Sequence, residues 1–200
     1  MEIGILALQG AFIEHRKMIE TLGATAREVR LPEHLDGLGG LIIPGGESTT
    51  IGKLAVSYGL IGPLRDFALN KPTWGTCAGM IFLAKDIGGD RQPLLGVMDL
   101  RVNRNAFGRQ IDSFERDLDI AGIEGGPFHA IFIRAPVATS AGTGVDVMAR
   151  LDDGSIVAAR QGHLLATAFH PELSGDSRVH QFFLELVAST RESNLRRDVG

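Results

Sequence analysis

A cysteine between two glycines is the residue of this sequence with the clearest chemical potential. Cys77, the only cysteine of the chain, lies in the run Gly75-Thr-Cys-Ala-Gly79. The run joins a predicted strand over residues 72–75 to the apolar stretch Met80–Ala84, and flanking glycines let a strand turn sharply into a helix around an exposed nucleophile. A helix N-terminus acidifies such a thiol, and the amide of Ala78 would point at a developing oxyanion. We therefore predict a nucleophile, although a lone cysteine elsewhere is more often a packing residue.

A histidine and a glutamate two residues apart supply the general base that a thiol nucleophile needs. His170-Pro-Glu172 follows the apolar segment 164–169, and carboxyl ends of strands are where open α/β sheets place their sites. Spacing of two residues in extended backbone puts both side chains on one side, so Glu172 can orient the ring while its other nitrogen faces the thiol. We interpret the remaining histidines as structural or exposed, without a comparable setting: His15, His34, His129, His163 and His180.

A glycine pair after a second predicted strand is suited to binding a negative oxygen. Pro44-Gly-Gly-Glu-Ser48 ends the strand predicted over Gly40–Ile43, and glycine amides are free to turn toward an oxyanion. A nucleotide loop is the alternative, but neither the Walker A spacing nor a G-x-G-x-x-G motif is present. The loop is therefore interpreted as an oxyanion or small-substrate site.

Hydrophobic patterning predicts the elements that position these residues. Short apolar runs at 3–8, 40–43 and 72–75 alternate with helical spacing at 11–22 and at 48–58, capped by Ser48 or Thr49, which is typical of a doubly wound α/β domain. The second half is predicted to be antiparallel, with strands at 95–98, 130–133, 145–149, 155–159 and 164–169 and a hairpin turn at Asp152-Asp-Gly154. The polar segment 101–128 is interpreted as a solvated face, and a helix is expected from Asp176 to about Thr190.

Composition describes one ordinary globular domain and narrows the classes of function. The 200 residues carry 20 basic and 24 acidic side chains, a net charge of −4, so nucleic acid is a poor partner. One cysteine excludes an intramolecular disulfide framework and a multi-cysteine zinc site, and we expect no metal. The N-terminus lacks the basic region of a signal peptide, and no apolar run is long enough for a membrane span. The expected location is the cytoplasm.

The order P-G-G-E-S, G-x-C-x-G, H-P-E resembles class I glutamine amidotransferases with a Cys-His-Glu triad. Other segments, above all Arg104-Asn-Ala-Phe-Gly-Arg-Gln110 and Phe132-Ile-Arg-Ala-Pro136, resemble the glutaminase subunits of pyridoxal 5′-phosphate synthase more specifically. The resemblance implies a single-domain, flavodoxin-like three-layer sandwich with a mixed central sheet over residues 1–190. Residues 191–200 carry no motif, and we expect a disordered tail.

The resemblance also implies a reaction and a set of site residues. Cys77 would attack the side-chain amide of glutamine, His170 would transfer protons to ammonia and from water, and Glu172 would orient His170. Glutamine is expected on Gly46, Glu47, Ser48, Arg104, Ile133 and Arg134. This revises the solvated-face interpretation for Arg104, since arginine suits an α-carboxylate. The oxyanion site is expected at Gly45, Gly46, Ala78 and Gln9.

Family resemblance further implies a partner. The ammonia would pass through a tunnel to a separate synthase subunit, a (βα)₈ barrel that builds pyridoxal 5′-phosphate, and twelve of each subunit can assemble into one particle. The chain itself would bind no cofactor. Three alternatives stay open: another class I amidotransferase subunit, a stand-alone cysteine hydrolase of the same fold, and a non-catalytic binding protein with an idle thiol.

Overall fold

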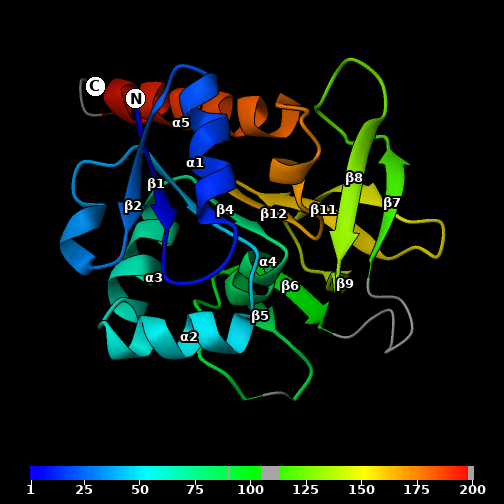
Figure 1. Cartoon of the computed structure of the whole chain (residues 1–200), viewed down its shortest axis with the longest axis horizontal. Helices are drawn as coiled ribbons and strands as arrows, with labels where there is room; N and C mark the ends of the chain where they lie inside the picture. The colour runs from blue at the N-terminus through cyan, green and yellow to red at the C-terminus, as the bar shows by residue number, and fades with distance from the viewer. Residues whose placement is uncertain (90, 105–112, 198–200) are drawn as a thin grey trace.

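A ten-stranded mixed sheet forms the centre of the molecule, with a separate two-stranded sheet beside it (Figure 1). The computed structural model describes residues 1–89, 91–104 and 113–197. The elements of the first half are β1 Glu2–Leu6, α1 Phe12–Thr21, β2 Thr25–Val29, η1 Pro32–Leu35, β3 Gly40–Ile43, α2 Ser48–Ser57, α3 Ile61–Asn70, β4 Thr73–Thr76, α4 Ala78–Leu83 and β5 Ala84–Asp86. The second half contains β6 Met98–Asn103, β7 Ser113–Leu118, β8 Phe128–Ile133, β9 Val137–Ala141, β10 Asp146–Arg150, β11 Ile156–Gln161, β12 Leu164–Thr167, η2 Pro171–Leu173 and α5 Arg178–Arg197.

Five parallel strands, in the order β2-β1-β3-β4-β12, make up one half of the large sheet. Strands β1, β3 and β4 are buried almost throughout because helices cover both of their faces. From β1 the chain adds β2 on one side of the sheet and then β3, β4 and β12 on the other, so the topological switch point lies between β1 and β3. In doubly wound sheets, ligands bind at the carboxyl ends of the strands next to such a switch point. This order is the flavodoxin-like one, so the predicted α/β fold is confirmed.

The other half of the sheet is largely antiparallel, as the sequence predicted. Strand β11 pairs antiparallel with β12, β10 and β9, and β6 pairs antiparallel with β9 and parallel with β5 at the edge. The predicted turn at residues 152–154 connects β10 to β11, where the Ser155 N–H donates to Asp153 Oδ1. Strands β7 and β8 form a hairpin of their own.

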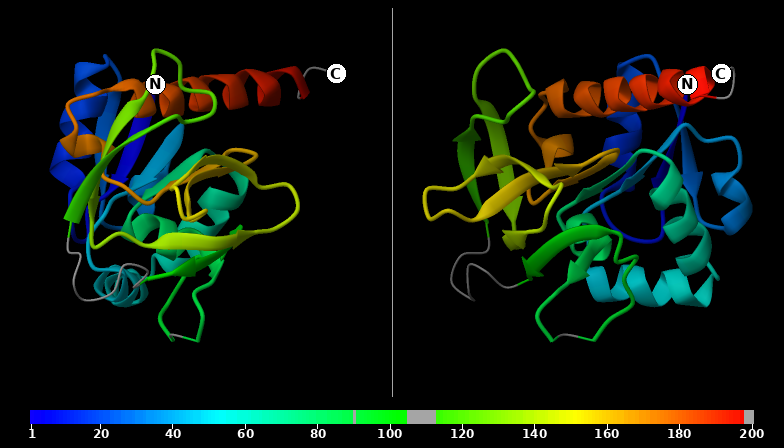
Figure 2. Two further views of the ribbon diagram at one scale, coloured as in Figure 1. Left: turned by 90° about the vertical axis from the view of Figure 1, so that its right-hand side faces the viewer. Right: turned by 180° about the vertical axis from the view of Figure 1, so that it is seen from behind.

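Helices cover the parallel half on both faces and give the sandwich its three layers (Figure 2). Helices α1 and α5 pack together on one face, where His15 of α1 meets His180 of α5. Helix α2 contacts α3 and α4, and these three helices cover the opposite face (Figure 2). Within the described ranges, no helix is both long and apolar enough to cross a membrane.

Several elements differ from the sequence-based expectations. Strands β2, β7 and β9 and helix α3 were not predicted, because their apolar residues are too few or too interrupted to show a clear period. The strand expected at 95–98 is wrong: β6 begins at Met98, and the preceding residues form a loop. Strand β7 lies inside the segment interpreted as a solvated face, and only Phe114 and Leu118 of its residues turn inward.

The expected disordered tail is wrong for most of its length. Helix α5 continues past Thr190 to Arg197, and residues 198–200 lie outside the described part of the chain. Residues 191–197 are mostly polar and show no apolar stripe, so their sequence did not predict a packed helix. Once the first turns of α5 have formed, however, each further helical residue costs little free energy because the helix is already nucleated.

The two glycines around Cys77 permit close packing between β4, α4 and β3. A Cβ atom on Gly75 would collide with the backbone of Gly79, and one on Gly79 would collide with the carbonyl group of Ile43. The strand-to-helix turn therefore depends on the absence of side chains at both positions.

Replacing Gly79 by alanine tests this packing. We expect Gly79→Ala to lower the free energy of unfolding by about 1–3 kcal/mol, because the obstacle is backbone that must shift. The matched control is Gly62→Ala in α3, where nothing lies within 4 Å of the added methyl group. The control should be neutral or stabilising by up to about 1 kcal/mol. Urea unfolding measures both, and equal stability of the two variants would contradict the account.

Candidate active site

Cys77 occupies a strained position at the junction of β4 and α4. Its φ of 48° and ψ of −105° lie outside the regions that residues with a side chain normally adopt. The Cys77 N–H donates to the Thr167 carbonyl of β12 at 2.8 Å, which fixes the turn to the neighbouring strand. The thiol is 6% exposed, and its Sγ lies 3.8 Å from the Ile133 carbonyl oxygen. This is the geometry of a nucleophile elbow.

His170 and Glu172 meet beside this thiol, as their spacing predicted. His170 Nδ1 is 2.7 Å from Glu172 Oε1, and both side chains are buried. A Cβ atom built on Gly45 would touch both the His170 ring and the Cβ of Cys77, so the two side chains border the same glycine. Burial lowers the pKa of His170, but hydrogen bonds with Cys77 and Glu172 outweigh burial and raise it to about 10. The imidazole is therefore held as a cation between a thiol and a carboxylate.

A second pair of histidines lies behind the carboxylate. Glu172 Oε2 is 3.3 Å from His15 Nε2, and His15 Nδ1 is 2.9 Å from His180 Nε2. The interpretation of His15 and His180 as residues without a comparable setting is wrong, since His15 contacts the carboxylate that orients His170. His15 lies on the same helical face as the apolar residues Phe12 and Ile19, and this pattern predicts that the ring is buried. The pattern does not predict which residues of the sheet the ring contacts.

The glycine loop after β3 lies directly against the site. The Gly45 N–H donates to Thr76 Oγ1 at 3.0 Å, and the Gly45 carbonyl accepts from the Ala11 N–H at 3.1 Å. Gln9 Oε1 accepts from the Glu47 N–H at 2.7 Å, so Gln9 contacts the loop. The structure therefore gathers the carboxyl ends of β1, β3, β4 and β12 around Cys77.

Glu47 caps helix α2, a role that the sequence had assigned to Ser48 or Thr49. Its carboxylate accepts from the N–H groups of Thr49 and Thr50, at 2.9 and 2.7 Å. Partial burial raises the pKa of Glu47, and the hydrogen bonds from Thr50 and Thr49 outweigh it and lower the pKa to about 2. Arg104 reaches the same corner, with Nη2 3.4 Å from Glu47 Oε1 and 3.1 Å from Thr49 Oγ1.

Three further expected substrate residues are Ile133, Arg134 and Ser48. Ile133 is partly exposed and provides the carbonyl next to the Cys77 thiol. Arg134 follows it with a φ of 46°, an uncommon conformation for a residue with a side chain. The Ser48 hydroxyl is buried and donates to Gln92 Oε1 at 3.3 Å, a contact that no sequence motif indicated. Most of the specific motif 104–110 lies outside the described residues.

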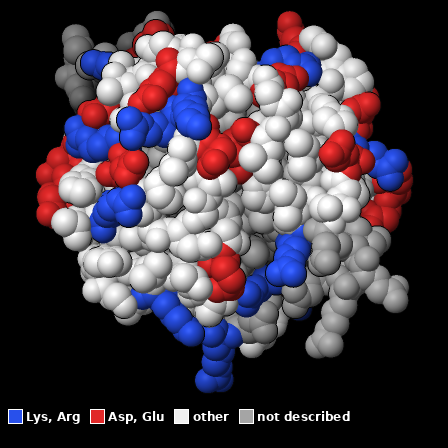
Figure 3. Space-filling view, viewed as in Figure 1, with Lys and Arg blue, Asp and Glu red and all other residues white. Residues whose placement is uncertain are grey.

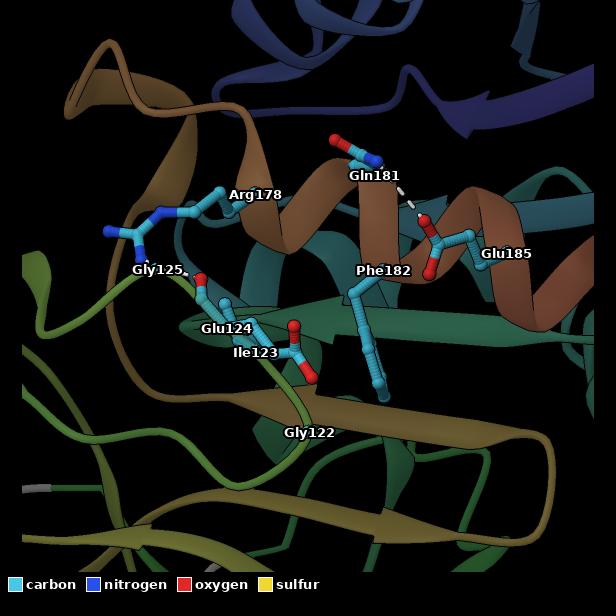
Figure 4. A pocket seen from close by; sticks show the side chains of 8 residues that line it. All are labelled: Gly122, Ile123, Glu124, Gly125, Arg178, Gln181, Phe182 and Glu185. Carbon is cyan, nitrogen blue, oxygen red and sulfur yellow. Dashed lines mark hydrogen bonds between the residues drawn. The ribbon is translucent and has the colours of Figure 1, made fainter.

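A hollow between α5 and the loop before β8 is a poor alternative site (Figure 4). Arg178 is its cationic side chain, and its guanidinium donates to the carbonyls of Glu124, Gly126 and Pro127 and to the Asp176 carboxylate. The arginine is therefore committed to holding the loop. The hollow contains none of the expected site residues.

Charge on the face shown in Figure 3 offers no rival function. Basic and acidic side chains are mixed on the face shown in Figure 3, and the middle of that face is mostly uncharged. In the ranges that the structure describes, no three His, Cys, Asp or Glu side chains are grouped as a metal site.

Comparison with known proteins identifies the family. The model of the SNO glutamine amidotransferase family matches residues 5–189. The chain belongs to this family. The predicted resemblance and the predicted enzyme class are therefore confirmed.

Individual relatives agree over nearly the whole chain. A protein of Herpetosiphon aurantiacus named "Pyridoxal 5'-phosphate synthase subunit PdxT" is 58% identical, covering 93% of this chain and 100% of the relative. One of the same name from Dehalococcoides mccartyi is 57% identical, covering 94% and 97%. A solved glutamine amidotransferase structure superposes with a TM-score of 0.88 at 53% identity, covering 93% of this chain and 98% of that one.

The buried side chains of His15 and His180 make the free energy of unfolding depend on pH. Burial lowers the pKa of His180 to about 3, and burial together with the imidazoles of His180 and His170 lowers that of His15. Below about pH 6.5 the unfolded chain binds protons on these rings that the folded chain does not, so the free energy of unfolding falls as pH falls. The slope approaches about 1.4 kcal/mol per pH unit for each such histidine.

Urea unfolding at about pH 6.5 and at about pH 4.5 measures this slope. We expect His180→Phe to show a smaller loss of stability between these two pH values than the wild type. His170, with a raised pKa, is protonated in both states at the lower pH and adds no slope there. An unchanged slope in the variant would show that His180 is not held neutral.

The cap on α2 predicts a modest effect on stability. Glu47→Ala leaves two N–H groups of the first turn without their acceptor, which costs about 1 kcal/mol in the free energy of unfolding. The control is Glu192→Ala, an exposed helical glutamate in α5, which should stay within about 0.5 kcal/mol of the wild type. Urea unfolding at neutral pH compares them, and a neutral Glu47→Ala would rule out the capping role.

Proposed function

We propose that Cys77, His170 and Glu172 perform the glutaminase reaction of this chain, the glutaminase subunit of a pyridoxal 5′-phosphate synthase. The supporting observation is the 2.7 Å contact between His170 and Glu172 beside a thiol on a strained strand-to-helix turn. Nucleophile, base and orienting group stand in the order that thiol catalysis requires.

The first half of the reaction releases ammonia. The Cys77 thiolate attacks the side-chain amide carbon of glutamine, and the electron pair of the C=O double bond moves to oxygen. His170, held as a cation by its raised pKa, gives its proton to the amide nitrogen. The C–N bond then breaks, ammonia leaves and a glutamyl thioester remains on Cys77.

The second half restores the enzyme. His170, now neutral, takes a proton from a water molecule that attacks the thioester carbon. The C–S bond breaks, glutamate leaves, and the thiolate pairs again with the imidazolium. Glu172 stabilises the cation in both halves because its Oε1 stays on Nδ1 of the ring.

Oxyanion stabilisation is assigned to the amide of Ala78 and to the Gly45-Gly46 loop, with Gln9 supporting the loop. In the structure the Gly45 N–H donates to Thr76 Oγ1. For that N–H to meet an oxyanion, the peptide before Gly45 must turn, and glycine is the residue that most readily permits such a rotation.

Glutamine is assigned to the corner formed by the loop, the start of α2 and the end of β8. Arg104 suits the α-carboxylate and Glu47 the α-ammonium group, since their charges are opposite to those of the substrate. The remaining contacts are assigned to Gly46, Ser48, Ile133 and Arg134.

The name shared by the relatives supports a synthase partner for this chain. We include in the proposal a (βα)₈-barrel synthase subunit that receives the ammonia through a tunnel, and an assembly with twelve copies of each subunit. A catalytic thiol must stay reduced, which favours the cytoplasm as the location. We assign no cofactor to this chain, because the proposed reaction uses only the thiol, the imidazole and the carboxylate.

Glutamate release from glutamine, measured with and without the synthase subunit, tests the assignment. Cys77→Ser and His170→Asn should each lower release by about 1000-fold or more while the variants unfold cooperatively like the wild type. Ser57→Ala, an exposed hydroxyl at the end of α2, serves as the mutagenesis control.

Each alternative function has its own outcome. Release that does not respond to the synthase would indicate a stand-alone hydrolase. No release in either condition, with a folded wild-type chain, would favour a binding protein with an idle thiol. Substantial activity in either variant would overturn the role of that residue.

A further inference from the structure

A buried polar network behind the proposed triad is not used by the reaction as described. It consists of His15 on α1, His180 on α5 and Thr76 on β4, all buried, with Trp74 packed against both rings at centroid distances of 5.5 and 4.9 Å. Burying two imidazoles is costly unless their polar atoms are paired. We therefore asked which group of the proposed triad this network contacts.

The network contacts the triad where His15 lies beside the second carboxylate oxygen of Glu172, Oε2. Oε2 is buried and has no hydrogen bond of good geometry among the described residues, while His15 Nε2 lies 3.3 Å away. The same nitrogen is 3.2 Å from Thr76 Oγ1. A proton on Nε2 would be donated to Thr76 Oγ1 and would also present its positive partial charge to Glu172 Oε2, 3.3 Å from the nitrogen.

The hydrogen-bond pattern decides which nitrogen of His15 carries the proton. If Nδ1 carried it, Nε2 would present a lone pair to the carboxylate, and His180 would keep a buried, unpaired N–H on its Nδ1. If Nε2 carries it, Nδ1 accepts from the Nε2–H of His180, and His180 Nδ1 is left as an unpaired acceptor only. The second arrangement avoids repulsion at Glu172 and a buried unpaired donor, so it costs less.

We propose that His15, with its tautomer set by His180, is a positioning residue of the glutaminase reaction. Its Nε2–H holds Oε2 of Glu172 and thereby keeps Oε1 on Nδ1 of His170. A carboxylate held at one oxygen alone can rotate about its terminal bond, and second contacts of this kind fix orientation. This proposal rests on the triad assignment above.

Two substitutions of His15 test whether the site needs a hydrogen-bond donor at the position of Nε2 or only a polar side chain. The amide nitrogen of glutamine extends about as far as Nε2 of histidine, whereas that of asparagine reaches only the Nδ1 position. With the synthase subunit and glutamine, His15→Asn should lower kcat for glutamate release by about tenfold, or about 1.4 kcal/mol, with KM nearly unchanged. His15→Gln should recover most of kcat.

A second measurement reports the Cys77–His170 pair without any turnover. The rate of Cys77 alkylation by iodoacetamide rises with pH as the thiolate forms. If the Glu172 carboxylate is free to rotate, it stabilises the protonated form of His170 less. A smaller fraction of protonated His170 then stabilises the Cys77 thiolate less. The alkylation profile of His15→Asn should therefore shift to higher pH by about one unit, while that of His15→Gln stays near the wild type.

The outcomes distinguish this proposal from the proposed function. An inactive wild-type complex would overturn the glutaminase assignment itself. An active wild type with the same kcat and alkylation profile in His15→Asn would overturn only the positioning role. Equal losses in His15→Asn and His15→Gln would also overturn it, because only the glutamine variant restores the donor.

His180 gives an independent test if His15→Asn does not fold. His180→Phe removes the Nε2–H but keeps an aromatic ring beside Trp74 and His15. We expect a several-fold lower kcat and an alkylation profile shifted to higher pH in this variant. A wild-type profile in folded His180→Phe would contradict the proposed tautomer control.

Discussion

The unusual backbone conformation of Cys77 is the constraint on which the rest of the site depends. A positive φ at a residue with a side chain persists only where its surroundings enforce it. Here the Cys77 N–H is tied to Thr167 of β12, and the following helix packs against β3 at Gly79. The thiol is thus aimed toward His170 by the two strands that flank β4.

The sheet topology explains why residues from distant parts of the chain meet. Four adjacent parallel strands end at one edge, and the segments that follow them carry Gln9, Gly45, Cys77 and His170. The separate two-stranded sheet contributes differently, since hairpin β7–β8 brings the Ile133 carbonyl to the thiol. The thiol is therefore bordered by both sheets: strand ends of the large sheet position the proposed catalytic residues, and the end of β8 in the small sheet lies beside the thiol.

Local sequence patterns predicted the parts of the site that depend on local geometry. The spacing of His170 and Glu172 and the glycines around Cys77 each specify a short-range conformation, and the structure has both. His15 and His180 could not be assigned this way, because their meeting depends on how α1 packs against α5. The cap by Glu47 was also missed: the side chain expected to contact the substrate also caps its own helix.

Thr76 gives the site a property that no single contact shows. One hydroxyl oxygen accepts from the Gly45 N–H and lies 3.2 Å from His15 Nε2, so the glycine loop and the support of Glu172 share an atom. Residues that share a hydrogen-bonding partner generally have non-additive energetic effects. Changes in the loop and changes behind the carboxylate will therefore not be independent, so the energetic effect of a substitution at one depends on the residue present at the other.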